Sequence, residues 1–182
     1  MMDSKTVYTQ VLGEVFLQMV TKGREQVAAL RKDGMMQHRL HNIGLIVRDI
    51  EKTVETYCDL FELDRDQIQV VDMKEDRLKM AFVSLGGTLL EIYQPVGPPP
   101  RDTRHLTEMR EIGEGVFHLA FMVEEYEQEV QRLRQKGYEV AEDIVTDLDP
   151  RYETRLAWVP PESTGGYWLE LIDEATASPA WS

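Results

Sequence analysis

Four polar side chains interrupt apolar stretches of this 182-residue chain at two matching pairs of positions. Asn42 and His118 each begin a short apolar run, and the difference 118 − 42 is 76. Glu91 and Glu170 each lie between two large aliphatic residues, and the difference 170 − 91 is 79. Two carboxylates, an imidazole and an amide together make a donor set for a divalent metal ion, provided that the fold brings them to one place.

Each of these residues also has a plainer interpretation. A glutamate on a strand most simply faces solvent, because burying an unpaired charge is costly. A single histidine in an apolar strand is most simply a hydrogen-bonded structural residue. The repeated placement favours one shared site on a curved sheet, but the residues by themselves leave both interpretations open.

The offset between Asn42 and His118 belongs to a longer internal repeat. Residues 42–54 (NIGLIVRDIEKTV) and 118–130 (HLAFMVEEYEQEV) both pass from an apolar run through charged residues into apolar positions at helical spacing. Three strand-like runs then follow in each copy, with a glycine pair before the last one. The sequence therefore predicts an α+β fold. Two βαβββ modules pair by pseudo-twofold symmetry into a curved, cup-like mixed sheet, since neither could bury its sheet alone.

Apolar residues at helical spacing before the repeat predict an N-terminal helical extension. The expected boundaries are an extension over 1–36, a domain over 37–175 and a tail over 176–182. Within the domain we expect module one at 39–95, a proline-rich connector at 96–112 and module two at 113–174.

The composition excludes several classes of function. The net charge of −13 disfavours nucleic acids and membrane surfaces as partners, because both are polyanions. Cys58 is the only cysteine, so the chain forms no internal disulfide and a reducing cytoplasm is the expected location. We find no signal-peptide pattern and no apolar run of the roughly 20 residues that span a bilayer.

Four runs in the repeat, LHNIGLIVRDIEKTVETYCDLFEL, LLEIYQP, GEGVFHLAFMVEE and STGGYWLELID, resemble the vicinal oxygen chelate superfamily. This group contains glyoxalases, epimerases, extradiol dioxygenases and bleomycin-binding proteins. The resemblance covers roughly residues 39–174, and the spacing of the runs is most similar to the methylmalonyl-CoA epimerase branch.

The resemblance implies a metal site with one His and one Glu or Gln from the first module, and a His and a Glu from the second. Glu91, His118 and Glu170 match this pattern, but Asn42 stands in place of the first His. The neighbouring His41 would face the other side of the strand, so we expect it on the surface or behind the ligands. An amide oxygen shifts the preference toward Mn²⁺, Mg²⁺, Co²⁺ or Fe²⁺ over Zn²⁺; the alternative is a site that binds no metal.

The resemblance further implies an isomerase or lyase that removes a proton next to a metal-polarised carbonyl of a small acyl compound. Glu170 or Glu91 would carry the proton, and epimerisation of an acyl-CoA thioester is the most specific form of this hypothesis. A cationic rim for CoA would come from a set of loop arginines that could equally be solvated charge: Arg101, Arg104, Arg110, Arg151 and Arg155.

Two other functions stay open. One is a metal-free module that binds a small molecule or antibiotic, with stacking surface from Tyr93, Phe117, Met122 and Trp168. The other is an iron dioxygenase, which Asn42 disfavours because it breaks a two-His, one-carboxylate triad. The resemblance also implies a homodimer.

Overall fold

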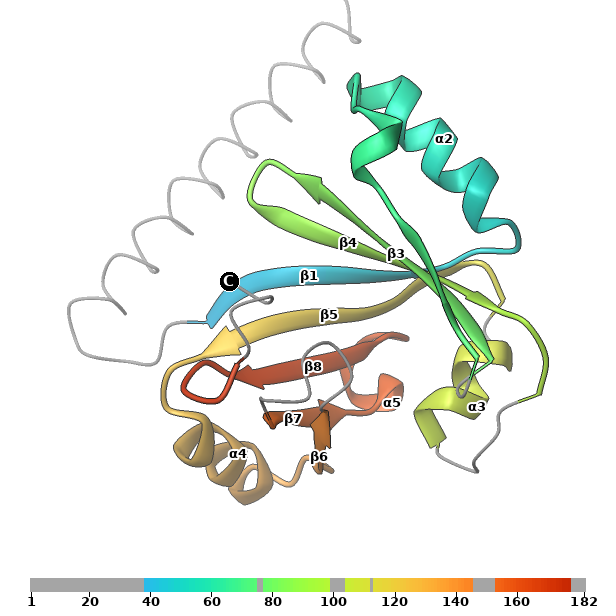
Figure 1. Cartoon of the computed structure of the whole chain (residues 1–182). Helices are drawn as coiled ribbons and strands as arrows, with labels where there is room; N and C mark the ends of the chain where they lie inside the picture. Colours follow the sequence, from blue (N-terminus) through green and yellow to red (C-terminus); the bar gives the residue numbers. More distant parts are fainter. Residues whose placement is uncertain (1–37, 75–76, 99–103, 112, 146–152, 178–182) are drawn as a thin grey trace, which may run out of the picture. The chain divides into compact units, whose positions relative to one another are not determined.

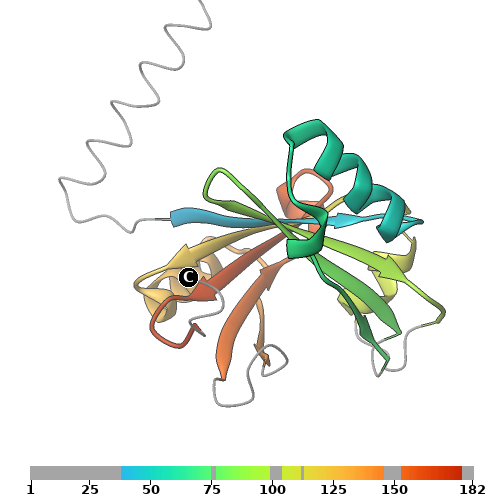
Figure 2. The same ribbon diagram turned by 45° about the horizontal axis from the view of Figure 1, so that its top comes forward.

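The computed structural model describes residues 38–74, 77–98, 104–111, 113–145 and 153–177 (Figure 1). The extension predicted for residues 1–36 and most of the predicted tail lie outside these described residues. The described part from His38 onward contains one eight-stranded mixed sheet, with strand order β2-β3-β4-β1-β5-β8-β7-β6. Figures 1 and 2 show this sheet twisting into an open, curved surface. The predicted α+β class and cup-like sheet are confirmed.

The βαβββ plan occurs twice. The first copy consists of β1 (His38–Ile46), α2 (Ile50–Phe61), the 3₁₀ turn η1 (Arg65–Gln67), β2 (Val70–Met73), β3 (Leu78–Leu85) and β4 (Thr88–Pro95). The connector contributes α3 (Arg104–Glu111). The second copy consists of β5 (Gly115–Val123), α4 (Tyr126–Gln135), β6 (Ala141–Val145), β7 (Thr154–Val159), the short helix α5 (Pro161–Thr164) and β8 (Trp168–Asp173).

The two copies meet where β1 and β5 run antiparallel in the middle of the sheet. On their outer sides β1 pairs with β4 and β5 pairs with β8, in both cases parallel. The strands of Asn42 and His118 are therefore neighbours, and each is flanked by a strand that carries a glutamate. In the register, Gly44 lies opposite both Glu91 and His118, and Ala120 lies opposite Glu170.

Helices α2 and α4 pack on the convex face of the sheet, each over its own module (Figures 1 and 2). The buried positions of α2 are Ile50, Val54 and Cys58, a regular spacing that forms one apolar stripe. Asp49 caps this helix by accepting a hydrogen bond from the backbone N–H of Lys52. No helix among the described residues is long and apolar enough to cross a membrane. The other face of the sheet carries further buried apolar residues, among them Met122, Leu156 and Trp168, together with the four polar residues.

The β1–β5 pairing contains two irregularities. The register shifts between Leu40 and Asn42, and again between Gly44 and Leu45. In the first of these His41 is an extra residue on β1, which is the pattern of a β-bulge. Such a bulge bends the strand and changes the direction of neighbouring side chains. Both irregularities flank the stretch that carries the candidate functional residues.

Candidate active site

The four polar residues come from four adjacent strands and meet on the concave face of the sheet. His118 Nε2 lies 2.9 Å from Asn42 Oδ1, 3.3 Å from Glu91 Oε2 and 3.5 Å from Glu170 Oε2. All four side chains are buried, with at most 3% of any residue exposed. The solvent-facing interpretation of the two glutamates is therefore wrong. Two carboxylates and an imidazole buried in one place need a chemical reason, because isolated buried charges are costly.

Asn42 connects the members of this cluster. Its amide nitrogen donates to Glu91 Oε1 at 3.1 Å, and its carbonyl oxygen accepts from His118 Nε2. The second amide proton points to His41 Nδ1, also at 3.1 Å. An amide nitrogen can only donate, so His41 Nδ1 is the acceptor. An amide oxygen can only accept, so His118 Nε2 carries a proton in this arrangement. Asn42 thus joins a carboxylate and an imidazole that belong to different modules.

The structure corrects the expectation for His41. This residue is 5% exposed, so it does not lie on the surface as one of the two expectations had it. The bulge at position 41 lets two consecutive side chains of β1, those of His41 and Asn42, contact each other inside the protein. A strict alternation of strand faces predicts opposite sides for these two side chains, and the bulge breaks that alternation. His41 is therefore buried next to Asn42 and accepts a hydrogen bond from its amide.

Tyr93 is a member of the cluster that the sequence suggested only as stacking surface. Its hydroxyl donates to Glu91 Oε2 at 2.5 Å. Burial raises the pKa of Tyr93 well above its ordinary value, and the charge of Glu91 raises it further. The hydroxyl therefore stays protonated and keeps donating. Together with Asn42, Tyr93 fixes both oxygens of the Glu91 carboxylate.

Burial raises the pKa of Glu170 to about 8, against the opposing charge of His118 and with a further contribution from Glu91. Glu170 is accordingly a protonated acid at neutral pH. Burial alone lowers the pKa of His118, but its hydrogen bond to Glu91 and the charges of Glu170 and Glu91 outweigh burial and raise it. The cluster therefore contains groups that can exchange protons near physiological pH.

Rings surround His118 and keep water away from it. The ring centroids of Phe117, Trp158 and Tyr93 lie 5.5, 5.7 and 6.0 Å from that of the imidazole. Trp168, 4% exposed, packs edge-on against Trp158. Of these rings, the sequence did not indicate Trp158. An apolar wall around a few convergent polar groups is typical of small-molecule sites.

Gly44 leaves the space in which the His118 ring lies. A Cβ at this position would stand 2.4 Å from Cε1 of His118 and 2.6 Å from its Nδ1, which is far inside van der Waals contact. The φ of Gly44 is not positive, so alanine is acceptable to the backbone and the conflict is with the ring alone. The absence of a side chain at Gly44 therefore lets the imidazole lie close to the backbone of β1.

We predict that Gly44→Ala destabilises the protein by about 1–3 kcal/mol, the usual cost of overpacking a buried site. Denaturant unfolding measures this loss. In a His118→Ala background the ring is gone, and the same substitution should then be nearly neutral, which a double-mutant cycle will show. An equal cost in both backgrounds would show that Gly44 does not act on His118.

The donor types of the cluster fit a divalent ion. Donors bound to one ion at about 2.1 Å lie about 3.0–3.4 Å apart, close to the separations around His118 Nε2. In the described residues, however, no group of three or more His, Cys, Asp and Glu side chains is arranged to hold a metal ion. The donors point at each other, and Asn42 bridges two of them. The residues therefore fit a divalent ion by donor type, and holding one would require the side chains to turn toward a common centre.

The proposed cationic rim is only partly described. Arg101 and Arg151 lie outside the described residues, and the side chain of Arg104 is not described. Arg110 donates to the carbonyls of Gly97 and Arg77, which fastens the connector.

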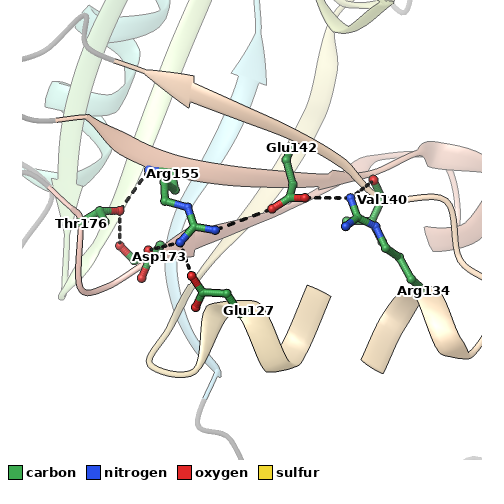
Figure 3. A network of polar contacts seen from close by, with 7 residues as sticks. All are labelled: Glu127, Arg134, Val140, Glu142, Arg155, Asp173 and Thr176. Carbon is green, nitrogen blue, oxygen red and sulfur yellow. Dashed lines mark hydrogen bonds and ion pairs between the residues drawn. The ribbon is translucent and has the colours of Figure 1, made fainter. Parts of the chain in front are cut away.

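Arg155 is part of an acidic network on the convex side (Figure 3). It forms ion pairs with Glu127, Glu142 and Asp173, and lies 4.6 Å from the Tyr126 ring centroid. The same network includes Arg134, which pairs with Glu142 at 2.9 Å. Arg155 joins α4 to three strands instead of facing the concave site, so the structure does not support it as a rim residue.

Residues 39–171 match the profile of the Glyoxalase/Bleomycin resistance protein/Dioxygenase superfamily, and the chain belongs to this family. Among curated proteins it is similar to the mitochondrial methylmalonyl-CoA epimerase of Mus musculus, with 29% identity over 133 residues, 73% of this chain and 71% of the relative.

Among solved structures, a hypothetical protein from Bacillus halodurans C-125 has the same fold (TM-score 0.58, 19% identity, 78% of this chain and 98% of that one). So does methylmalonyl-CoA epimerase from Mycobacterium tuberculosis (TM-score 0.55, 18% identity, 78% and 89%). The resemblance deduced from the sequence is confirmed at the family level.

Proposed function

We propose that the protein is a divalent-ion-dependent isomerase or lyase that moves a proton at the carbon next to the carbonyl of a small acyl compound. Epimerisation of an acyl-CoA thioester such as methylmalonyl-CoA is the most specific form of the proposal. The observation that carries it is the pair of buried carboxylates, Glu91 and Glu170, that both approach one nitrogen of His118 within 3.5 Å.

Epimerisation requires one group to remove a proton and another to return one to the opposite face. We assign the acid role to Glu170, because burial raises its pKa to about 8 in the ion-free site. With the ion bound, its carboxyl would have to leave the ion in order to carry the proton. Glu91 is held at both oxygens by Asn42 and Tyr93, so its carboxylate is oriented to accept a proton. In the reverse direction the two exchange roles. His118 Nε2 lies within 3.5 Å of both carboxyl groups.

Asn42 Oδ1, His118 Nε2 and the carboxylates of Glu91 and Glu170 are the atoms that would hold the ion. A divalent ion held there would supply Lewis-acid polarisation of the substrate carbonyl, which would acidify the neighbouring C–H bond. To act as a ligand, His118 must move its proton from Nε2 to Nδ1. That Nδ1 is buried and finds no hydrogen-bond acceptor among the residues described. This lack lowers the expected affinity of the site for the ion.

Likeness to the mouse epimerase supports an acyl-CoA substrate. The net charge of −13 and the acidic surroundings of Arg155 disfavour a large anionic cofactor. The broader form of the proposal is therefore a smaller acyl compound as the substrate. The homodimer and the cytoplasmic location expected from the sequence stay predictions.

Solvent exchange tests the proposed chemistry directly. Methylmalonyl-CoA incubated in D₂O with the protein and Mn²⁺, Co²⁺ or Mg²⁺ should exchange its α-proton for deuterium, which mass spectrometry of the quenched thioester measures. The uncatalysed exchange of the thioester alone is the baseline. Exchange no faster than the baseline with any of these ions, or with a panel of smaller 2-substituted acyl compounds, would contradict the proposal.

The Asn42 bridge favours a second candidate, a metal-free binding module of the same fold. An amide that already joins Glu91 and His118 satisfies these groups without an ion. In that case ligands would bind against the rings around His118, and no ion would be needed. Ligand binding that is unchanged by a chelator, without any exchange of protons, would support this candidate.

A further inference from the structure

A hollow lies on the convex face of the sheet, away from the four polar residues. It has a volume of about 450 Å³, which falls within the range of small-molecule sites. We call it the α4–α5 groove, because α4 forms one wall and α5 with the following loop forms the other. Its lining also includes the first residue of β1.

The floor of this groove is apolar. Leu169 and Leu171 of β8 face it, and Phe121 and Val159 extend it across β5 and β7. These two leucines flank Glu170, which points to the concave side. Leu133 of α4 closes the floor on the helix side. A ligand body that contacts this floor must therefore be apolar.

The rim on the α4 side is basic in a chain that is strongly acidic. Arg132 is paired with Glu129, its Nε donating to Oε2 at 2.6 Å, and His38 Nε2 lies 3.0 Å from Glu129 Oε1. This leaves the carboxylate of Glu129 satisfied by two basic neighbours. Lys136, one turn further along, makes no ion pair with any residue in the described ranges. The charge that remains for a ligand at this rim is positive.

We propose that the α4–α5 groove binds an amphipathic carboxylate, with the anionic head at Lys136 and an aliphatic or aromatic body on the floor of Leu169, Leu171 and Phe121. Tyr138 and Tyr167 also line the groove and supply aromatic surface and hydroxyl groups. This site is separate from the proposed reaction, because the sheet lies between the groove and His118. Its occupant would stand behind the strand that carries Glu170.

Isothermal titration with decanoate tests the proposal on the full chain. We expect a Kd on the order of 10–100 μM, in keeping with the binding free energy per atom that small apolar ligands reach. Decyltrimethylammonium, which has the same chain but a positive head, should bind at least fivefold more weakly. The absence of decanoate binding, or equal binding of both amphiphiles, would overturn the assignment.

Variants locate the binding. Lys136→Glu should weaken decanoate at least fivefold, while Lys52→Glu, the same change on α2 of the other module, should leave it unchanged. Ser163→Trp places an indole at the mouth of the groove and should abolish binding; Ser163 is exposed, and thermal unfolding will check that the variant folds. Glu170→Gln alters the concave site and should leave decanoate binding as it is. Binding that is lost in Glu170→Gln but kept in Ser163→Trp would place decanoate on the concave face and refute the proposal.

Discussion

Glu170→Gln lowers the rate of α-proton exchange in the acyl substrate by about 10²–10⁴-fold, the usual contribution of a general acid or base. Glutamine has the size and hydrogen-bonding ability of a protonated glutamate, so the packing around Glu170 is retained. What it cannot do is give up and recover a proton. The expected loss is therefore in the exchange rate, measured at saturating substrate, with little change in the unfolding free energy.

Glu174→Gln is the matched control. Glu174 follows β8 closely and its side chain is 44% exposed, in a long contact with Arg39. The substitution makes the same change of side chain in a neighbouring part of the chain without touching the concave site, and exchange should stay within twofold of the unmodified protein. If Glu170→Gln exchanged protons as fast as this control, Glu170 would not be the proton carrier.

Asn42→His raises the affinity for Zn²⁺ and Ni²⁺ by about 10–100-fold, because an imidazole is a better ligand than an amide for these ions. It also removes the bridge by which Asn42 joins Glu91 to His118. Competition titration with a chromogenic chelator measures the affinity. Mn²⁺ and Mg²⁺, which prefer oxygen donors, should gain much less than Zn²⁺.

Asn42→Asp separates the effect of charge from that of the imidazole. It adds a third carboxylate with the shape of the original side chain, so it should favour Mg²⁺ and Mn²⁺ over Zn²⁺. If Asn42→His left the Zn²⁺ affinity where it was, Asn42 would be a structural link that does not face the ion.

The fold was predictable because the sequence pattern that encodes it occurs twice in the chain. The constant offset between the runs that begin at Asn42 and His118 indicates two copies of one plan, and matching Glu91 with Glu170 adds the last strand of each. Apolar periodicity then decides which segments are helices and which are strands. The central pairing of the two copies agrees with the predicted pseudo-twofold relation.

Local departures from regularity were not predictable. The bulge at His41 depends on how β1 and β5 align, and these strands lie in different modules, so no short stretch of sequence records it. The need for a glycine at position 44 follows from where the His118 ring lies. The contact of Tyr93 with Glu91 was within reach of the sequence, because residues two apart on one strand share a face. A lone glycine in a strand is nevertheless a recognised sign of close approach, and this signal was present at Gly44.

The role of Arg155 could not be predicted for a related reason. Arg155 looked available for an anionic ligand, because a sequence does not show that Glu127, Glu142 and Asp173 come together around it. The α4–α5 groove was equally hidden, since its lining comes from segments as far apart in the chain as His38 and Leu171. Contacts between residues so far apart in the chain follow only from the three-dimensional fold.

The central claim is that Asn42, Glu91, His118 and Glu170 act as one divalent-ion site. Elemental analysis of the protein, purified without a chelator or an affinity tag, tests it most directly, beside Glu170→Ala and His118→Ala. We predict about one divalent ion per chain in the unmodified protein and its loss in both variants. An unmodified protein that holds no ion, and that gains no thermal stability when Mn²⁺, Co²⁺ or Zn²⁺ is added, would contradict the claim.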